Sequence, residues 1–370
     1  MDSIPRITIT PLPYQPAYEI VEAEEEETKE RLLRSLHKIS DITYQDSGHG
    51  LRSVHAKSHG LLLGKMRVLD GLPPELAQGI FAKALSYPVV MRLSTTPGDV
   101  LDDHISTPRG MAVKVIGVEG ERLDSSPGDV TQDFVMVNGP LFPTPSAKKF
   151  VGGLELLAST TDKAPGLKKA LSSVLRGAEK ALEAVGAESA TLKSLGGHPV
   201  THILGETFYS QAPILFGPYM AKLQIVPVAS TLQALTGKAV DLHGKPDGMR
   251  ESVVAYFADQ GAEWEVRVQL CTDLDSMPIE DASLPWSEQQ SPFFAVARIT
   301  APPQAGWNAA LSKAVDDGMA FNPWHGIAAH RPIGSIMRVR KVAYQLSSRL
   351  RAERNGVALV EPKNLDDFPG

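Results

Sequence analysis

Three short stretches decide the fold class: Pro88-Val-Val-Met-Arg-Leu-Ser94, Met111-Ala-Val-Lys-Val-Ile-Gly117 and Phe134-Val-Met-Val137. Each is rich in β-branched residues and is separated from the next by glycine, proline or aspartate, which is typical of strands joined by turns. Similar sequence covers residues 53–56 and returns over 201–228 and 251–272. These segments predict one large antiparallel sheet or barrel.

Helical patterns surround the strands. We expect a first helix over 22–39, whose acidic first turn and basic last turn suit the helix dipole, and a last helix over 333–354. Apolar residues recur at helical spacing between 146 and 195, which predicts a helical insertion. The expected order of elements is a helix, strands, helices, strands and a helix. This order is typical of an α+β protein and differs from the alternation of βαβ units.

The chain divides into three expected parts. Residues 1–21 form an extended arm, because Pro11, Pro13 and Pro16 do not fit a helix interior. Residues 22–354 form a single domain that contains the helical insertion, and residues 355–370 form a C-terminal tail.

Composition excludes several classes of function. Lys and Arg number 37 against 43 Asp and Glu, a formal charge of −6, which argues against a nucleic-acid partner. The N-terminus lacks a signal-peptide pattern and no long apolar run occurs, so we expect a cytoplasmic protein without a membrane span. Cys271 is the single cysteine, which excludes an intrachain disulfide and a cysteine-rich metal site. Dinucleotide, P-loop, zinc-protease and serine-hydrolase motifs do not occur.

One pair of residues in the last expected helix points to metal chemistry. Arg340 and Tyr344 are four residues apart, so their side chains lie on one helix face. A guanidinium beside a phenol favours the phenolate form. An anionic tyrosine is a suitable ligand for ferric iron, as in the haem site of catalase.

Further motifs precede this pair in a fixed order. They are Leu51-Arg-Ser-Val-His-Ala-Lys57, Pro88-Val-Val-Met-Arg-Leu-Ser94, Thr107-Pro-Arg-Gly-Met-Ala-Val-Lys114 and Asp133-Phe-Val-Met-Val-Asn-Gly-Pro-Leu-Phe-Pro143. With Arg340 and Tyr344, they make the chain resemble the haem catalase superfamily over about residues 28–354, although 146–195 matches poorly. The stretch Phe321-Asn-Pro-Trp-His325 is similar to the short, catalase-related peroxidases of that superfamily. The resemblance implies a catalase-type antiparallel β-barrel with a helical insertion and a C-terminal helix that carries the haem ligand.

The resemblance also implies catalytic roles. His55 would be the distal acid and base that moves a proton between the two peroxide oxygens, and Ser94 would hold its ring. Catalases carry a distal asparagine, and counting back from the Phe134–Pro143 segment places its slot near Asp129. That departure puts rapid disproportionation of hydrogen peroxide in doubt.

A haem b cofactor would contact the remaining site residues. Tyr344 would be the iron ligand, with Arg340 as its partner. Three arginines would bind the propionates, Phe142 would pack beside the ring and Val54 would narrow the access channel; the arginines are Arg52, Arg92 and Arg351.

The expected function is therefore a haem-dependent peroxidase that reduces hydrogen peroxide or organic hydroperoxides with a small organic donor. Weak catalase activity is compatible with the same site. Two alternatives stay open: a fatty-acid hydroperoxide dehydratase similar to catalase-related allene oxide synthases, and a barrel that binds haem without catalysis. The sequence leaves a homo-oligomer open as well.

Overall fold

Eight antiparallel strands close into a barrel in the computed structural model, which describes residues 7–160 and 199–369. Around the barrel the order is β1, β2, β3, β4, β5, β7, β8 and β9; β5 pairs with β7 and β9 pairs with β1, while β6 adds to β7 as a ninth strand. The strands are β1 (Lys57–Val68), β2 (Ser86–Thr95), β3 (Arg109–Ile116), β4 (Thr131–Val137), β5 (Phe208–Tyr209), β6 (Ile214–Phe216), β7 (Tyr219–Pro227), β8 (Ala262–Leu270) and β9 (Phe294–Ala301).

Strand β3 is buried on both faces, as is most of β2, which explains the apolar runs of these two strands. One face carries Met111 and Val113 and belongs to the main core, which includes the fully buried Trp264. The other face carries Val90 and Ala112 and is covered by side chains from residues 311–321. The expected antiparallel barrel is therefore confirmed.

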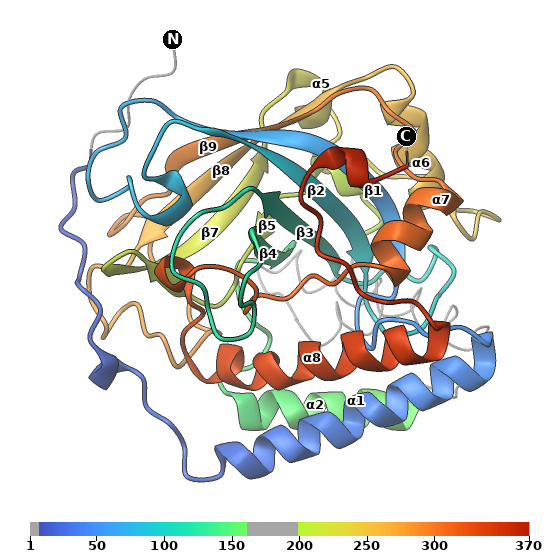
Figure 1. Ribbon diagram of the computed structural model, residues 1–370, viewed down its shortest axis with the longest axis horizontal. Helices are drawn as coiled ribbons and strands as arrows, with labels where there is room; N and C mark the ends of the chain where they lie inside the picture. The colour runs from blue at the N-terminus through green and yellow to red at the C-terminus, as the bar shows by residue number, and fades with distance from the viewer. Residues whose placement is uncertain (1–6, 161–198, 370) are drawn as a thin grey trace, which may run out of the picture.

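Three long helices lie side by side along one end of the barrel: α1 (Glu25–Ser47), α2 (Ala147–Thr160) and α8 (Ser335–Asn355) (Figure 1). Both α1 and α8 end at a glycine in the left-handed region, Gly48 and Gly356. The shorter α-helices of the described residues are α5 (Ser230–Gln233), α6 (Gly248–Phe257) and α7 (Ala309–Ser312), and α7 continues into a π-helical turn at Lys313–Asp317. Beyond α2, the expected helical insertion lies outside the described residues.

The described parts of both terminal segments pack on the barrel. In the N-terminal arm, the Leu12 N–H donates to the Cys271 carbonyl and Pro13 bridges to Tyr219. In the C-terminal tail, the Val360 N–H donates to the Gly318 carbonyl, and the half-buried Phe368 packs with Val90 and its neighbours. Among the described helices, none is long and apolar enough to cross a membrane.

Two segments differ from the expected strands. Residues 53–56 form a bend before β1, because His55 adopts a left-handed backbone with φ +56°, which no strand accommodates. Residues 251–257 belong to α6, whose Met249, Val253 and Phe257 recur every four residues and are buried. The β-branched Val253 and Val254 favour a strand locally, but tertiary packing of this apolar face favours the helix.

Candidate functional site

The bend before β1 sets the His55 ring against the backbone of β3. Its Nδ1 lies 3.3 Å from Ser94 Oγ at the end of β2. A Cβ atom at Gly110 would lie 2.7 Å from the same Nδ1, so only glycine leaves room for the ring there. No described residue hydrogen-bonds Nε2. Burial, reinforced by the charges of Arg92 and Arg340, lowers the pKa of His55 to about 3, so the imidazole is neutral at physiological pH.

Helix α8 brings the Arg340–Tyr344 pair next to the segment that carries His55. Arg340 Nη2 donates to Tyr344 Oη at 2.7 Å, and the guanidinium also lies 5.2 Å from the phenol ring centre. On the same helix face, Ser347 Oγ accepts the Ser53 N–H at 3.1 Å. The structure thus brings together two pairs that the sequence predicted, His55 with Ser94 and Arg340 with Tyr344, and the bond from the Ser53 N–H to Ser347 Oγ ties the segment of His55 to α8.

A buried carboxylate that the sequence did not single out sits among the predicted arginines. Asp316, in the π-helical turn after α7, accepts from Arg92 Nε at 2.7 Å and from Arg52 Nη1 at 3.1 Å. Its second oxygen accepts from Ser58 and Ser312. Burial alone would raise the pKa of Asp316, but Arg92 and Arg52 outweigh it and hold that pKa well below its usual value.

The three predicted arginines are not equally available to a ligand. Both terminal nitrogens of Arg52 donate to this turn. Nη1 donates to the Asp316 carbonyl and carboxylate, and Nη2 donates to the Val315 and Met319 carbonyls. Arg52 therefore holds the end of the turn. Arg351 donates to Met319 through Nη2 only, and its buried Nε has no hydrogen-bond partner among the described residues.

This cluster (Arg52, Arg92, Arg351 and Asp316) carries more positive than negative charge. Burial and repulsion from the neighbouring arginines lower the pKa of Arg52, and burial together with Arg92 lowers that of Arg351 to about 10. Two of the three guanidiniums bond the one carboxylate and Arg351 does not, so an anionic group placed against Arg351 would stabilise the cluster. In the sequence, the adjacent aspartates within 313–319 could have indicated a charged site here. Nothing near them in the sequence indicates which arginines they contact.

Three other predicted residues lie away from the His55 ring or in the core. Asp129 precedes Thr131, which pairs with Ile116; Gly110 is at the opposite end of this ladder, about 20 Å away at the usual strand rise. The Asp129 carboxylate instead lies 3.6 Å from His325 Nε2.

The two apolar candidates pack into the protein interior. Phe142 is buried and meets Phe150 of α2 edge to face, with ring centres 5.1 Å apart. Val54 is half-buried at the edge of the main core. The contacts of both side chains are those of core residues.

No family model and no curated protein matches the chain. Solved structures do match. A fungal catalase superposes with a TM-score of 0.59 at 16% identity, over 83% of this chain and 60% of that one. Catalase A from Saccharomyces cerevisiae and a bacterial catalase each give a TM-score of 0.57 at 17% identity, over 83% of this chain and 62% and 59% of theirs.

This chain thus spans about 60% of the length of the catalases it matches. Sequence identity at this level supports a shared architecture and leaves activity to be argued from the site. The closed barrel, the three helices packed along it and these superpositions agree: the chain has the catalase fold.

Proposed function

We propose that the protein is a haem-dependent peroxidase, similar to the short catalase-related enzymes, which reduces hydrogen peroxide or organic hydroperoxides with a small organic donor. One observation carries this proposal: the neutral His55 is held on β3 within the field of Arg340, whose guanidinium bonds the Tyr344 phenol. We further propose residues 22–354 as the haem domain and the cytoplasm as its compartment.

The described residues fit haem b. Tyr344 offers a phenol oxygen whose described partner is a guanidinium, a donor suited to ferric iron. Arg351 and Arg92 would hold carboxylate groups of the cofactor, since Arg351 Nε has no partner among the described residues. Arg52 would not, because its terminal nitrogens already donate to residues 315–319. When bound, ferric haem supplies the redox chemistry that cleaves the peroxide O–O bond.

His55 would move the proton in this reaction. Ser94 Oγ beside Nδ1 fixes the ring orientation and leaves Nε2 to take a proton from one peroxide oxygen and return it to the departing one. Gly110, the neighbour of Ser94 across the sheet, leaves the space that the ring occupies. A neutral imidazole is the form that accepts a proton, so the low pKa of His55 suits the first half of this transfer.

Two variants test the proposal. Tyr344→Phe should lose haem or change its absorption spectrum, whereas Tyr44→Phe, on the exposed side of α1, should not. His55→Ala should keep haem but slow the reaction with peroxide by about two to four orders of magnitude, the usual worth of a positioned acid and base. A spectrum unchanged in Tyr344→Phe would falsify the assignment of the iron ligand.

The second candidate is a fatty-acid hydroperoxide dehydratase. It would use the same two residues, Tyr344 and His55; Asp129 does not bear on it, because its carboxylate lies against His325, about 20 Å from Gly110. Product analysis separates the two, because a dehydratase converts a lipid hydroperoxide to an allene oxide without consuming an organic donor. Haem binding without turnover of either substrate class would leave a haem-binding protein without catalysis.

A further inference from the structure

We propose that Arg338 is a positioning residue: it clamps the first turn of α8 to three distant segments and so sets where the helix presents Arg340 and Tyr344. The inference rests on the proposed function for its meaning, since Tyr344 is the proposed iron ligand. Its structural content can be tested without the cofactor.

Helix α8 begins without a cap of its own. Its N-cap is Gly334, at φ +88°, and its first turn carries no acidic residue. Carboxylates from elsewhere fill this place: Glu280 accepts the Ser335 N–H at 2.7 Å and Glu19 accepts the Gly334 N–H at 3.2 Å. Negative charge at a helix N-terminus is favourable, so tertiary contacts locate the start of α8.

Only glycine at position 334 leaves room for this arrangement. A Cβ atom at this position would lie 2.3 Å from the Ile279 carbonyl oxygen. The segment that carries Glu280 can approach the helix start only because no side chain stands between them. The glycine and the carboxylates are two independent features that fix the same contact.

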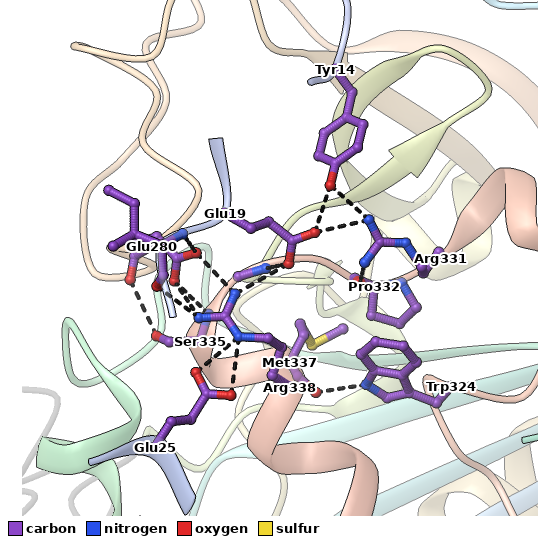
Figure 2. Close-up of polar contacts among 12 residues, drawn as sticks. Tyr14, Glu19, Glu25, Glu280, Trp324, Arg331, Pro332, Ser335, Met337 and Arg338 are labelled. Carbon is purple, nitrogen blue, oxygen red and sulfur yellow. Dashed lines mark hydrogen bonds and ion pairs between the residues drawn. The ribbon is translucent and has the colours of Figure 1, made fainter. Parts of the chain in front are cut away.

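Arg338, in the first turn of α8, bonds all of these segments at once (Figure 2). Its Nε donates to Glu25 of α1 at 2.9 Å, and Nη1 donates to Glu19 of the arm at 3.1 Å. Nη1 and Nη2 also form a two-pronged contact with Glu280, at 2.9 and 3.1 Å, and Nη2 donates to the Ile20 carbonyl. Each of the three guanidinium nitrogens thus has acceptors, which a lysine could not reproduce in this geometry.

The charges of this clamp are largely buried. The side chains of Arg338, Glu19 and Glu25 are 13%, 10% and 4% exposed. Burial alone would raise the pKa of Glu19, but Tyr14, Arg331 and the Gly334 N–H lower it below its usual value. Burial would lower the pKa of Arg338, but bonds to Glu280 and Glu25 raise it instead. The pairs therefore persist at neutral pH.

Arg338 acts on the site through the helix and not by contact. Tyr344 lies six residues later, about 9 Å along the axis, and the turn of about 100° per residue places Arg338 roughly on the opposite face from Arg340. Tyr344 and Arg351 share the Arg340 face within about 40°. One face of α8 is thus bonded to the arm, to α1 and to Glu280, while the other presents the proposed iron ligand.

The test compares Arg338→Met and Arg338→Lys with the control Arg349→Met. Arg349 lies on the same helix, but its side chain is 68% exposed and its Nε makes a long, exposed ion pair with Glu353, at 3.8 Å. The first readout is the ¹³C NMR signal of the Tyr344 ring in the cofactor-free protein, assigned with Tyr344→Phe. We expect Arg338→Met to shift this signal and to speed hydrogen exchange at residues 335–339 at least tenfold. Arg338→Lys should recover part of both effects, and Arg349→Met should produce neither.

The second readout is the absorption spectrum after haem is added, which should change in Arg338→Met relative to the parent. If Arg338→Met does not fold, Glu280→Gln replaces it, because it removes one charge and keeps the shape. Faster exchange with an unmoved Tyr344 signal would overturn the proposal and reduce the clamp to a stabilising contact. A parent protein that takes up no haem would refute the proposed function alone, since the NMR comparison still decides the role of Arg338.

Discussion

Substitution of Asp316 by asparagine should destabilise the protein far more than an ordinary change in a polar loop. The substitution conserves shape and hydrogen bonds: the amide oxygen can still accept from Arg92 and Arg52, and the amide nitrogen can donate to Ser58 and Ser312 in place of Oδ2. What it removes is the charge. Two charge-assisted bonds become neutral acceptor bonds, and the buried arginines lose the carboxylate they share.

The magnitude follows from these losses. Each charge-assisted bond is worth about 1 kcal/mol more than a neutral one, and breaking a buried ion pair costs about 3–5 kcal/mol. We expect the free energy of unfolding to fall by about 3–4 kcal/mol, within the range of these two figures. Urea titration of the cofactor-free protein, followed by circular dichroism, measures this difference directly.

Asp317→Asn is the matched control. Asp317 is the next residue, but its carboxylate bonds His49, whose side chain is 47% exposed, so we expect a loss of less than about 1 kcal/mol. The pH dependence gives a second check. The pKa of Asp316 is lowered on folding, so its stabilisation is present above the unfolded value of about 4 and is lost as pH falls through the folded value. Equal stability of the two variants, or a difference that grows on acidification, would refute this account of the cluster.

Three further predictions concern the neighbourhood of this cluster. Gly110→Ala should displace the His55 ring and slow the reaction with peroxide by about 10²-fold or more while the haem spectrum persists; parental rates would show that the ring has room to move. The rate of the peroxide reaction should show no inflection near pH 6.5, because the pKa of His55 lies far lower; a clear inflection there would contradict a neutral imidazole at this position. Glu361→Gln should lower the free energy of unfolding by about 1–3 kcal/mol and speed hydrogen exchange in the tail, because the Glu361 carboxylate lies 2.6 Å from Nζ of the fully buried Lys114. Exchange rates equal to those of the exposed variant Glu353→Gln would disprove this anchor.

The barrel could be predicted because its signal is local. β-Branched runs separated by turn residues mark β2, β3 and β4, and the i, i+4 spacing of Arg340 and Tyr344 survives folding unchanged. His55 and Ser94 were found through their motifs, and the structure sets them 3.3 Å apart. In each case a few neighbouring residues contain the information.

The remaining features depend on contacts between distant residues. Asp316 meets Arg52 across 264 positions, so the sequence could not show that Arg52 is already committed to the protein's own backbone. Asp129 was placed by counting along the chain, but strand register, which the count ignores, sets it at the far end of β4. The left-handed backbone of His55 sets its ring against Gly110, a residue 55 positions later in the sequence, and the strand-like residues around His55 do not show this contact.

The two fastened terminal segments bear on how the protein should be handled in the laboratory. Glu19 and Ile20 hold the helix of Tyr344, and Val360 is bonded to Gly318, two residues from the carboxylate that organises the arginines. Trimming either segment to obtain a smaller domain for crystallisation would remove contacts that hold α8 or the turn that carries Asp316. Affinity tags are better joined through a spacer that leaves residues 7–24 and 357–368 intact.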